Sequence, residues 1–420
     1  MKQLYLKSIL FLSTLIISQS ACAAGLWLYE AASPELGTAS AGSAAIANSA
    51  STAGFNPAGM TRLNDTEFMV GIQPMYVDAK FDIDTATYGN DDGGNAGGFV
   101  PSASMFYVTS LTDDIKFGLA MGSYLGLGLD YGESWAGRYF ITEGELLTLA
   151  INPSLGYKVN QQFSIGAGVD IVYSKLNQKI AFNNNPFGIG STADGMIEIE
   201  DSDIAYGFNL GLLYEFSEST RVGLTYRSQV DIEFEDALKL KNVLPIVSGI
   251  NSSTNTDIEM NLPATVILSG YHKVDKQWSV MANIGWQDWS EFGETDFTLK
   301  NLNQKFTDDR NFKDTWHIAL GTHYQLSVPW TLMAGIAYDS SPVSDKYRTI
   351  DMPLDRQIRY AFGAQYEFSK DLSIMAGYEL LDAGQAKINQ TRGILDNDIL
   401  NGDFKTNIIH IMTLNARWKF

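Results

Sequence analysis

Hydrophobic and polar residues alternate along most of the chain from about Thr66 onward. In residues 204–216 every even position is Ile, Tyr, Phe or Leu, whereas the odd positions are mostly small or polar. The same period of two recurs in residues 222–234, 278–286, 330–338, 358–368 and 408–420. Because successive side chains of a strand point to opposite faces, this pattern predicts strands with one apolar face.

The connections between these strands alternate between short and long. Short polar turns are expected at residues 111–114, 159–162, 217–220, 274–277, 325–329 and 369–371. Long connections are expected at residues 83–98, 127–144, 182–201, 236–259, 289–310, 341–355 and 382–405. Counting the segments between them gives about 14 strands, each long enough for the ~9–11 residues that cross a bilayer at a tilt. We therefore predict an all-β fold, an antiparallel transmembrane β-barrel of about 14 strands over residues 65–420.

The first residues predict export from the cytoplasm. Lys2 and Lys7 flank the start of an apolar core at residues 9–17, and a run of small residues follows up to Ala24. This layout is typical of a signal peptide over residues 1–23, with cleavage after Ala23 or Ala24. Acylation of Cys22, as in a lipoprotein, is the alternative. After Ala24 no apolar run is long enough for a spanning helix, so we expect a barrel in the bacterial outer membrane.

Composition excludes several classes of function. Asp and Glu number 48 against 29 Lys and Arg, giving a net charge of −19, whereas binding nucleic acid requires a surplus of cations. The sequence contains no nucleophile elbow, paired-cysteine metal site or phosphate loop, so we expect no enzyme, no metal site and no cofactor. An acidic loop around Asp82 and Asp91 could hold divalent ions that bridge lipopolysaccharide, although a solvated loop is the simpler interpretation.

Residues 24–64 belong to neither the signal peptide nor the barrel. They are dominated by Ala, Ser and Gly, with isolated larger residues that include Trp27, Leu36 and Phe55. About 40 residues cannot build an independent core in water without disulfides or a metal. We therefore predict that this segment, the hatch, folds inside the barrel and plugs it. A disordered linker is the alternative.

Several short motifs resemble the FadL-type outer-membrane transporters of long-chain fatty acids and other hydrophobic compounds. They are NPA at residues 56–58, WAGRY at 135–139, GLTYRS at 223–228, NLPATVILSGY at 261–271, QDWSEF at 287–292, FKDTWHIALGTHY at 312–324 and AYDSSPV at 337–343. The resemblance implies a monomeric 14-stranded barrel closed by an N-terminal hatch, in contact with outer-membrane lipid and lipopolysaccharide. It also implies capture of substrate in a groove of the outer loops, transfer to a pocket against the hatch, and lateral release through a kinked strand. Aromatic or alkane hydrocarbons are the alternative substrates, and a general diffusion porin is the alternative function.

The third predicted strand contains Gly118, Gly122, Gly126 and Gly128. Glycine in a strand marks bends and broken pairing, so we place the kink near Gly122 and Ser123. The alternative is that these glycines only make room for the hatch. On the first interpretation Asn56, Pro57 and Ala58 form the gate segment of the hatch, with Asn56 nearest the gap.

Inward-facing charges are the candidate ligand contacts. By its strand parity Lys313 points inward, and the resemblance assigns it to the carboxylate head group of the ligand. Lys175 is the second candidate, although its parity matches outward residues, which favours a lysine at the membrane interface. The other predicted inward charges are interpreted as an ion-pair network that holds the hatch; they are Arg227, Asp231, Glu233, Arg359 and Glu367.

Overall fold

The computed structural model describes residues 27–29, 31–185, 193–235, 238–243, 256–300, 303–392 and 398–420. The predicted signal peptide 1–23, with both candidate cleavage sites, and the start of the hatch at residue 24 lie outside these described residues.

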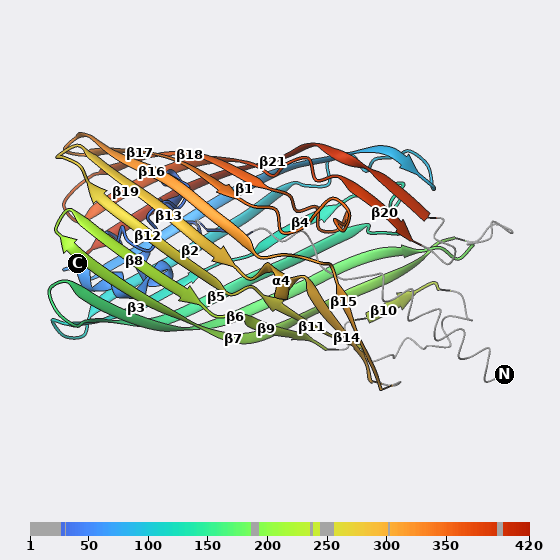
Figure 1. Cartoon of the computed structure of the whole chain (residues 1–420), viewed down its shortest axis with the longest axis horizontal. Helices are drawn as coiled ribbons and strands as arrows, with labels where there is room; N and C mark the ends of the chain where they lie inside the picture. The colour runs from blue at the N-terminus through green and yellow to red at the C-terminus, as the bar shows by residue number, and fades with distance from the viewer. Residues whose placement is uncertain are drawn as a thin grey trace.

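An antiparallel ring of strands forms the body of the protein (Figure 1). Its members in ring order are β1 (Glu67–Ala86), β2 (Phe99–Ser110), β3 (Ile115–Gly122) with β4 (Gly126–Asp130), β5 (Glu143–Lys158), β6 (Phe163–Phe182), β7 (Gly195–Ser217), β8 (Thr220–Arg227), β12 (Thr265–Lys273), β13 (Trp278–Gln287), β16 (Thr315–Ser327), β17 (Trp330–Asp339), β18 (Gln357–Glu367), β19 (Leu372–Asp382) and β21 (Asp398–Lys419). The ring closes where β21 pairs with β1, from Glu67 opposite Lys419 onward. With β3 and β4 counted as one interrupted strand, the ring has 14 strands, which confirms the predicted fold class.

The outer surface of the ring is apolar, as the alternation predicts. Ile204, Tyr206 and Leu320 are exposed by 55%, 68% and 58%. Aromatic pairs on neighbouring strands gather near the short turns and include Trp278 with Tyr324, and Trp330 with Tyr366. Such a belt is typical of the level where a barrel meets the lipid head groups.

Helices contribute little to this architecture. Among the described residues, no helix is both long enough and apolar enough to cross a bilayer.

The long connections contain strands that the sequence pattern did not resolve. β9 (Val230–Phe234), β11 (Thr256–Leu262), β14 (Glu294–Leu299) and β15 (Gln304–Asp309) form a separate four-stranded sheet, and α4 (Trp289–Phe292) lies beside it. β10 (Leu238–Lys241) pairs with β7, and β20 (Ile388–Arg392) pairs with β21. The four-stranded sheet of β9, β11, β14 and β15 is called the outer sheet below, because it lies toward the end of the barrel opposite the short turns (Figure 1).

The parity predicted for β9 is wrong. Ile232 and Phe234 are buried, whereas Asp231 and Glu233 are exposed. The reason is that β9 has left the barrel wall and pairs with β11, so its apolar side faces the lumen rather than lipid.

The hatch consists of three short helical turns, η1 (Pro34–Thr38), α2 (Thr52–Phe55) and η2 (Pro57–Arg62). η1 contacts β16, β17, β18, β19 and β21, whereas α2 contacts β2, β3 and β5, and η2 contacts β3, β5, β6 and β7. Contacts on all sides of the ring place these turns inside it, in the half that carries the short turns (Figure 1).

The hatch packs directly on the backbone of the wall. A Cβ on Gly223 would overlap the carbonyl of Ala44, and a Cβ on Gly335 would overlap that of Thr38. Two wall arginines add hydrogen bonds to hatch carbonyls: Arg221 Nε donates to Ala45 O at 2.5 Å, and Arg417 Nη1 donates to Asn48 O at 2.8 Å. Close approach at glycine and charge-assisted hydrogen bonds therefore fix the position of the hatch.

Candidate functional site

The third strand of the wall is interrupted at the predicted position. β3 ends at Gly122, β4 begins at Gly126, and Ser123 lies in the interruption. β2 pairs with β3 only from Met105 to Ser110, and within the described residues β4 pairs with β5 but with no part of β2. The wall therefore has a gap, bounded by the first half of β2 on one side and β4 on the other.

The glycines of this strand fall into two groups. A Cβ on Gly118 would overlap Met60 Sδ and lie 2.8 Å from Ala53 Cβ, so this glycine makes room for the hatch. A Cβ on Gly122 would have no neighbour closer than 3.7 Å, so hatch packing does not account for this second glycine. Both interpretations offered by the sequence thus apply, each to a different residue.

The hatch residues that touch the gap are Trp27 and Leu28 rather than Asn56. Leu28 N donates a hydrogen bond of 2.8 Å to Tyr124 O, and Trp27 forms an isolated antiparallel bridge with Leu125. Leu125 in turn exchanges hydrogen bonds with Thr148 of β5. The N-terminal part of the hatch therefore pairs with the backbone at the β4 side of the gap.

Asn56, Pro57 and Ala58 have a different place. Asn56 is fully buried; its Oδ1 accepts from Ala58 N at 3.1 Å, and its Nδ2 donates to Ala44 O and to Leu212 O of β7. Pro57 begins η2, where its missing N–H costs no hydrogen bond. This motif ties the hatch to itself and to the wall at β7, so the expectation that Asn56 is nearest the gap is wrong.

A continuous cluster of buried apolar side chains extends from the outer sheet to the gap; it is called the chamber below, because an apolar ligand would enter between these packed side chains. Its buried members include Trp27 and Tyr29 of the hatch, Leu125 and Val172 of the wall, Ile232, Phe234, Met260 and Phe297 of the outer sheet, and Met352 and Leu354 of the connection between β17 and β18. If these side chains move apart to admit a hydrocarbon chain, they can desolvate it along its length, at ~0.8 kcal/mol per buried methylene.

A charged cluster borders this chamber on the β16–β19 side of the wall. His317 Nδ1 lies 2.8 Å from Asp339 Oδ1, and Arg359 binds both Asp339 and Glu379 at 3.2 Å. Arg359 Nη2 also donates to Trp27 O at 3.1 Å, and the Tyr29 ring stacks on His317 with centroids 4.0 Å apart. The cluster therefore holds the same part of the hatch that pairs with the β4 side of the gap.

The predicted ligand cations are not in the chamber. Lys313 is exposed and precedes β16, and its backbone N donates to Pro342 O. Because β16 begins only at Thr315, strand parity does not place the Lys313 side chain inward, and its contact with a ligand carboxylate stays a prediction. Lys175 lies on β6 on the outward side with exposed Tyr173, and the structure places it away from the interior. Two buried cations reach chamber residues instead: Arg359 at Trp27 and Tyr29, and Arg348 at Val343 and Leu354.

The predicted ion-pair network is correct in part. Arg359 and Arg227 are inward and each binds a hatch carbonyl, Trp27 O and Gly54 O respectively. Glu367, by contrast, is exposed at the end of β18, like Asp231 and Glu233 on β9. The acidic partners of Arg359 are Asp339 and Glu379, and that of Arg227 is Asp170. The sequence does not reveal these acids as partners, because a buried acid on the inward face of a strand has the same pattern as a solvated one.

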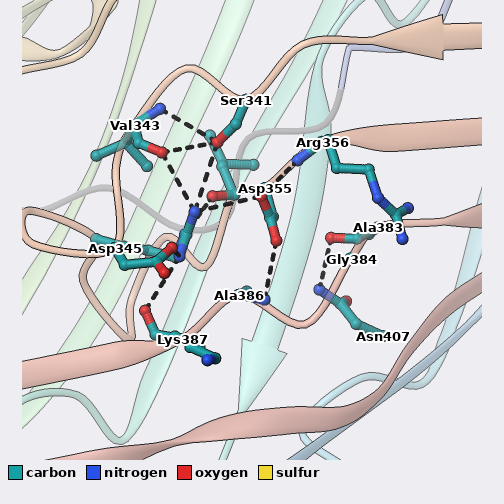
Figure 2. A network of polar contacts seen from close by, with 12 residues as sticks. Ser341, Val343, Asp345, Asp355, Arg356, Ala383, Gly384, Ala386, Lys387 and Asn407 are labelled. Atoms are coloured by element: carbon teal, nitrogen blue, oxygen red, sulfur yellow. Dashed lines mark hydrogen bonds and ion pairs between the residues drawn. The ribbon is translucent and has the colours of Figure 1, made fainter.

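A buried arginine organises the roof of the chamber. Arg348, 2% exposed, donates to Leu354 O at 2.6 Å and Lys387 O at 3.1 Å, and pairs with Asp345 and Asp355. Figure 2 shows this network joining the connection after β17 to the one after β19. The first connection supplies the roof residues Met352 and Leu354, so Arg348 determines where they lie.

Beside the roof lies a polar cavity of about 150 Å³, lined by residues that include Asp308, Arg310, Asp351 and Arg392. Arg310 pairs with Asp351 at 2.7 Å, and Arg392 donates to Phe140 O at 3.4 Å. Burial lowers the pKa of Arg392 to about 10 and raises the pKa of Asp308. Within the described residues, no group of three or more His, Cys, Asp or Glu side chains is arranged to hold a metal ion.

Comparison with known proteins agrees with this architecture. The family model for outer membrane protein transport proteins (OMPP1/FadL/TodX) matches residues 14–420. The long-chain fatty acid transport protein of Escherichia coli O6:H1 (strain CFT073) is 31% identical, covering 93% of this chain and 94% of that protein. Outer membrane protein P1 of Haemophilus influenzae is 27% identical over 93% of each chain.

Solved structures share the fold. A Pseudomonas aeruginosa FadL homologue has a TM-score of 0.85 at 21% identity, with 94% of this chain and 100% of that chain covered. The toluene transporter TodX of P. putida has a TM-score of 0.65 at 18% identity, with 88% and 94% covered. The match over nearly the whole chain shows that this protein belongs to the OMPP1/FadL/TodX family and lies in the bacterial outer membrane.

Proposed function

We propose that the protein takes up long-chain fatty acids across the outer membrane and releases them sideways into the bilayer. The observation that carries the proposal is the gap between β2 and β4, which adjoins the apolar chamber and is bordered by hatch residues: Trp27 and Leu28 pair with the β4 side, and Ala32 O accepts a hydrogen bond from Ser104 of β2. A hydrocarbon chain that has entered the chamber is separated from lipid at this point by a short segment of the hatch.

The route begins outside the membrane and follows the apolar lining. Substrate is captured among the outer loops, passes below the roof formed by Met352 and Leu354, and meets Trp27 at the gap. Binding is driven by removing methylene groups from water, and release is favourable because lipid is equally apolar. The hatch blocks the direct way to the periplasm, which argues against a general diffusion porin.

The curated relatives named for long-chain fatty acid transport support the fatty-acid substrate. One feature of the chamber favours hydrocarbons as the second candidate. Arg359 is already paired with two carboxylates, so its charge is balanced before any ligand arrives. A neutral aromatic or alkane chain would need no change in this cluster, whereas a fatty-acid head group would have to compete for the arginine.

The barrel closes with strands of one chain, which supports a monomer as the working unit. Contact with membrane lipid follows from the exposed apolar wall, and contact with lipopolysaccharide is proposed for the outer loops. The relatives are transporters and channels, which supports transport rather than catalysis.

Growth of a transporter-deficient bacterial strain on oleate, with and without this chain, tests the proposal. We expect the chain to restore growth and the initial rate of labelled oleate uptake. Toluene uptake is measured in parallel, as the readout for the hydrocarbon alternative. Restored toluene uptake without oleate uptake would replace the fatty-acid proposal, and failure to restore either would overturn it.

A further inference from the structure

Tyr124, in the interruption between β3 and β4, is held from two sides. On one side, its carbonyl accepts the hydrogen bond from Leu28 N, and the Trp27 ring stacks on its ring with centroids 6.5 Å apart. On the other side, the Arg227 guanidinium lies 4.0 Å from the Tyr124 ring centroid, and Tyr124 Oη donates to Asp170 Oδ1 at 3.3 Å. Tyr124 is therefore the wall residue on which hatch and interior contacts converge.

Arg227 connects three parts of the protein. It forms an ion pair with Asp170 of β6, lies over Tyr124, and donates through Nη2 to Gly54 O of α2 at 2.8 Å. The side chain of Asp170 is 1% exposed and that of Arg227 is 12% exposed, so these contacts are desolvated. One guanidinium thus contacts both the hatch, at Gly54 O, and Tyr124 in the interruption of the third strand.

We propose that Tyr124, Arg227 and Asp170 form a latch that keeps the gap closed while α2 is in place. Tyr124 is the latch residue, and Arg227 and Asp170 are positioning residues that transmit movement of α2 to it. If α2 shifts, Arg227 loses Gly54 O and its hold on the Tyr124 ring weakens. Trp27 and Leu28, which bind the ring and the carbonyl of Tyr124, then lose their fixed seat at the edge of the gap. The inference rests on the proposed lateral release, which it deepens by naming what controls the gap.

The wall contains a matched pair of residues that lies away from the gap. Arg221 lies 3.8 Å from the Tyr271 ring centroid and donates to Ala45 O of the hatch at 2.5 Å. Tyr271 lies on β12, whose pairing with β8 and β13 continues on both sides. This arginine–tyrosine pair holds the hatch but borders no interruption in the wall.

Thiol labelling at Ser123 tests the latch. Ser123→Cys is introduced into the full-length chain carrying Cys22→Ala, and its reaction with a lipid-soluble maleimide is followed in outer membranes. Tyr124→Phe removes only the hydroxyl, and we expect labelling to accelerate about threefold to tenfold, the range for loss of one hydrogen bond. Tyr271→Phe, the matched control, leaves the rate unchanged. Equal rates for Tyr124→Phe and the parent, or equal acceleration by Tyr271→Phe, would overturn the proposal.

A second variant tests the ion pair without leaving a buried charge unpaired. Arg227→Met alone would leave the Asp170 carboxylate buried without its cation and would destabilise the folded protein. It is therefore combined with Asp170→Asn. We expect this double variant to accelerate labelling at least as much as Tyr124→Phe, and adding Tyr124→Phe to have no further effect. Full additivity would show that the three residues do not act as one latch.

Oleate uptake separates failure of the latch from failure of the proposed function. Faster labelling together with unchanged oleate uptake would keep the latch and reject lateral release as the transport route. Unchanged labelling in a protein that transports oleate would reject the latch alone.

Discussion

Trp27 of the hatch and Leu125 of the barrel wall form an antiparallel β-bridge at the gap in the third strand. They are separated by nearly a hundred residues in sequence, yet both are buried in the same apolar chamber. The bridge ties the hatch to the edge of the gap. On the proposed route, these N-terminal hatch residues have to move before substrate passes from the chamber to lipid.

Locking this bridge is expected to block release but not capture. Trp27→Cys with Leu125→Cys places two thiols on bridged partners, where Cα atoms are close enough for a disulfide. In a chain with Cys22→Ala, oxidation should reduce oleate uptake at least about tenfold, and reduction should restore it. Oleate binding to the purified variant should differ by no more than about twofold between its oxidised and reduced forms.

Val70→Cys with Ala416→Cys is the control, because these residues are partners in the continuous wall between β21 and β1. Its oxidation should leave uptake unchanged. Full uptake in the oxidised Trp27–Leu125 variant would show that substrate leaves by another path.

Packing of the hatch against the wall is expected to be lost when a side chain is added at Gly223. Gly223→Val would place carbon atoms where the carbonyl of Ala44 lies, so the hatch cannot take its position while the strands still pair. We expect measurable ion conductance in planar bilayers and a heat-modifiable, folded barrel on gels. Gly270→Val is the control, since a Cβ there meets no atom within 4 Å. A non-conducting Gly223→Val barrel would mean that the hatch adapts to the added side chain.

The barrel itself was predictable from sequence because its cause is local and periodic. Alternation places one face of each strand in lipid, and the contrast between short turns and long connections sets the strand number. The outer sheet was not predictable in the same way. β9 follows β8 with unbroken alternation, so nothing in residues 222–234 shows that the chain leaves the wall after Arg227 and turns its apolar face inward.

The site was predictable only where a backbone signal marked it. Clustered glycines located the interruption at Gly122, but the hatch residue that borders it depends on how the hatch enters the lumen. Trp27 and Leu28 stand out as large apolar residues in a segment of small ones, and that contrast was the available signal. Lys313 was misplaced because parity continues in sequence beyond the point where β16 begins at Thr315.

Exposure of Lys313 predicts that removing its charge has little effect on binding. Lys313→Ala should leave the affinity for oleate within about twofold of the parent, because an exposed lysine contributes little to a buried head-group contact. Isothermal titration of the detergent-solubilised protein measures this. A loss of tenfold or more, about 1.4 kcal/mol, would place the head group at Lys313 and restore the original assignment.

We expect replacement of Arg359 to lower the free energy of unfolding, whether or not this residue contacts the ligand. Arg359→Met leaves Asp339 and Glu379 buried without their common cation, and breaking such a cluster costs about 3–5 kcal/mol. It also removes the hydrogen bond to Trp27 O. Urea unfolding in detergent should shift accordingly, whereas Arg356→Met, at a half-exposed pair with Asp382, should shift it by less than about 1 kcal/mol. Equal shifts for Arg359→Met and Arg356→Met would mean that the buried cluster stabilises the barrel no more than the half-exposed ion pair does.

Arg348 tests whether the roof of the chamber is a fixed part of the binding site. Its guanidinium supplies hydrogen bonds to Leu354 O, Val343 O and Lys387 O, and no other residue described in that connection binds all three (Figure 2). Arg348→Ala should therefore release the roof residues and weaken oleate binding about tenfold or more, without altering the heat-modifiable barrel. Lys346→Ala, on the same connection but exposed, should change neither property. Unchanged binding in Arg348→Ala would assign the capture of substrate to the outer sheet alone, because Phe234 and Phe297 would then form the chamber without help from the roof.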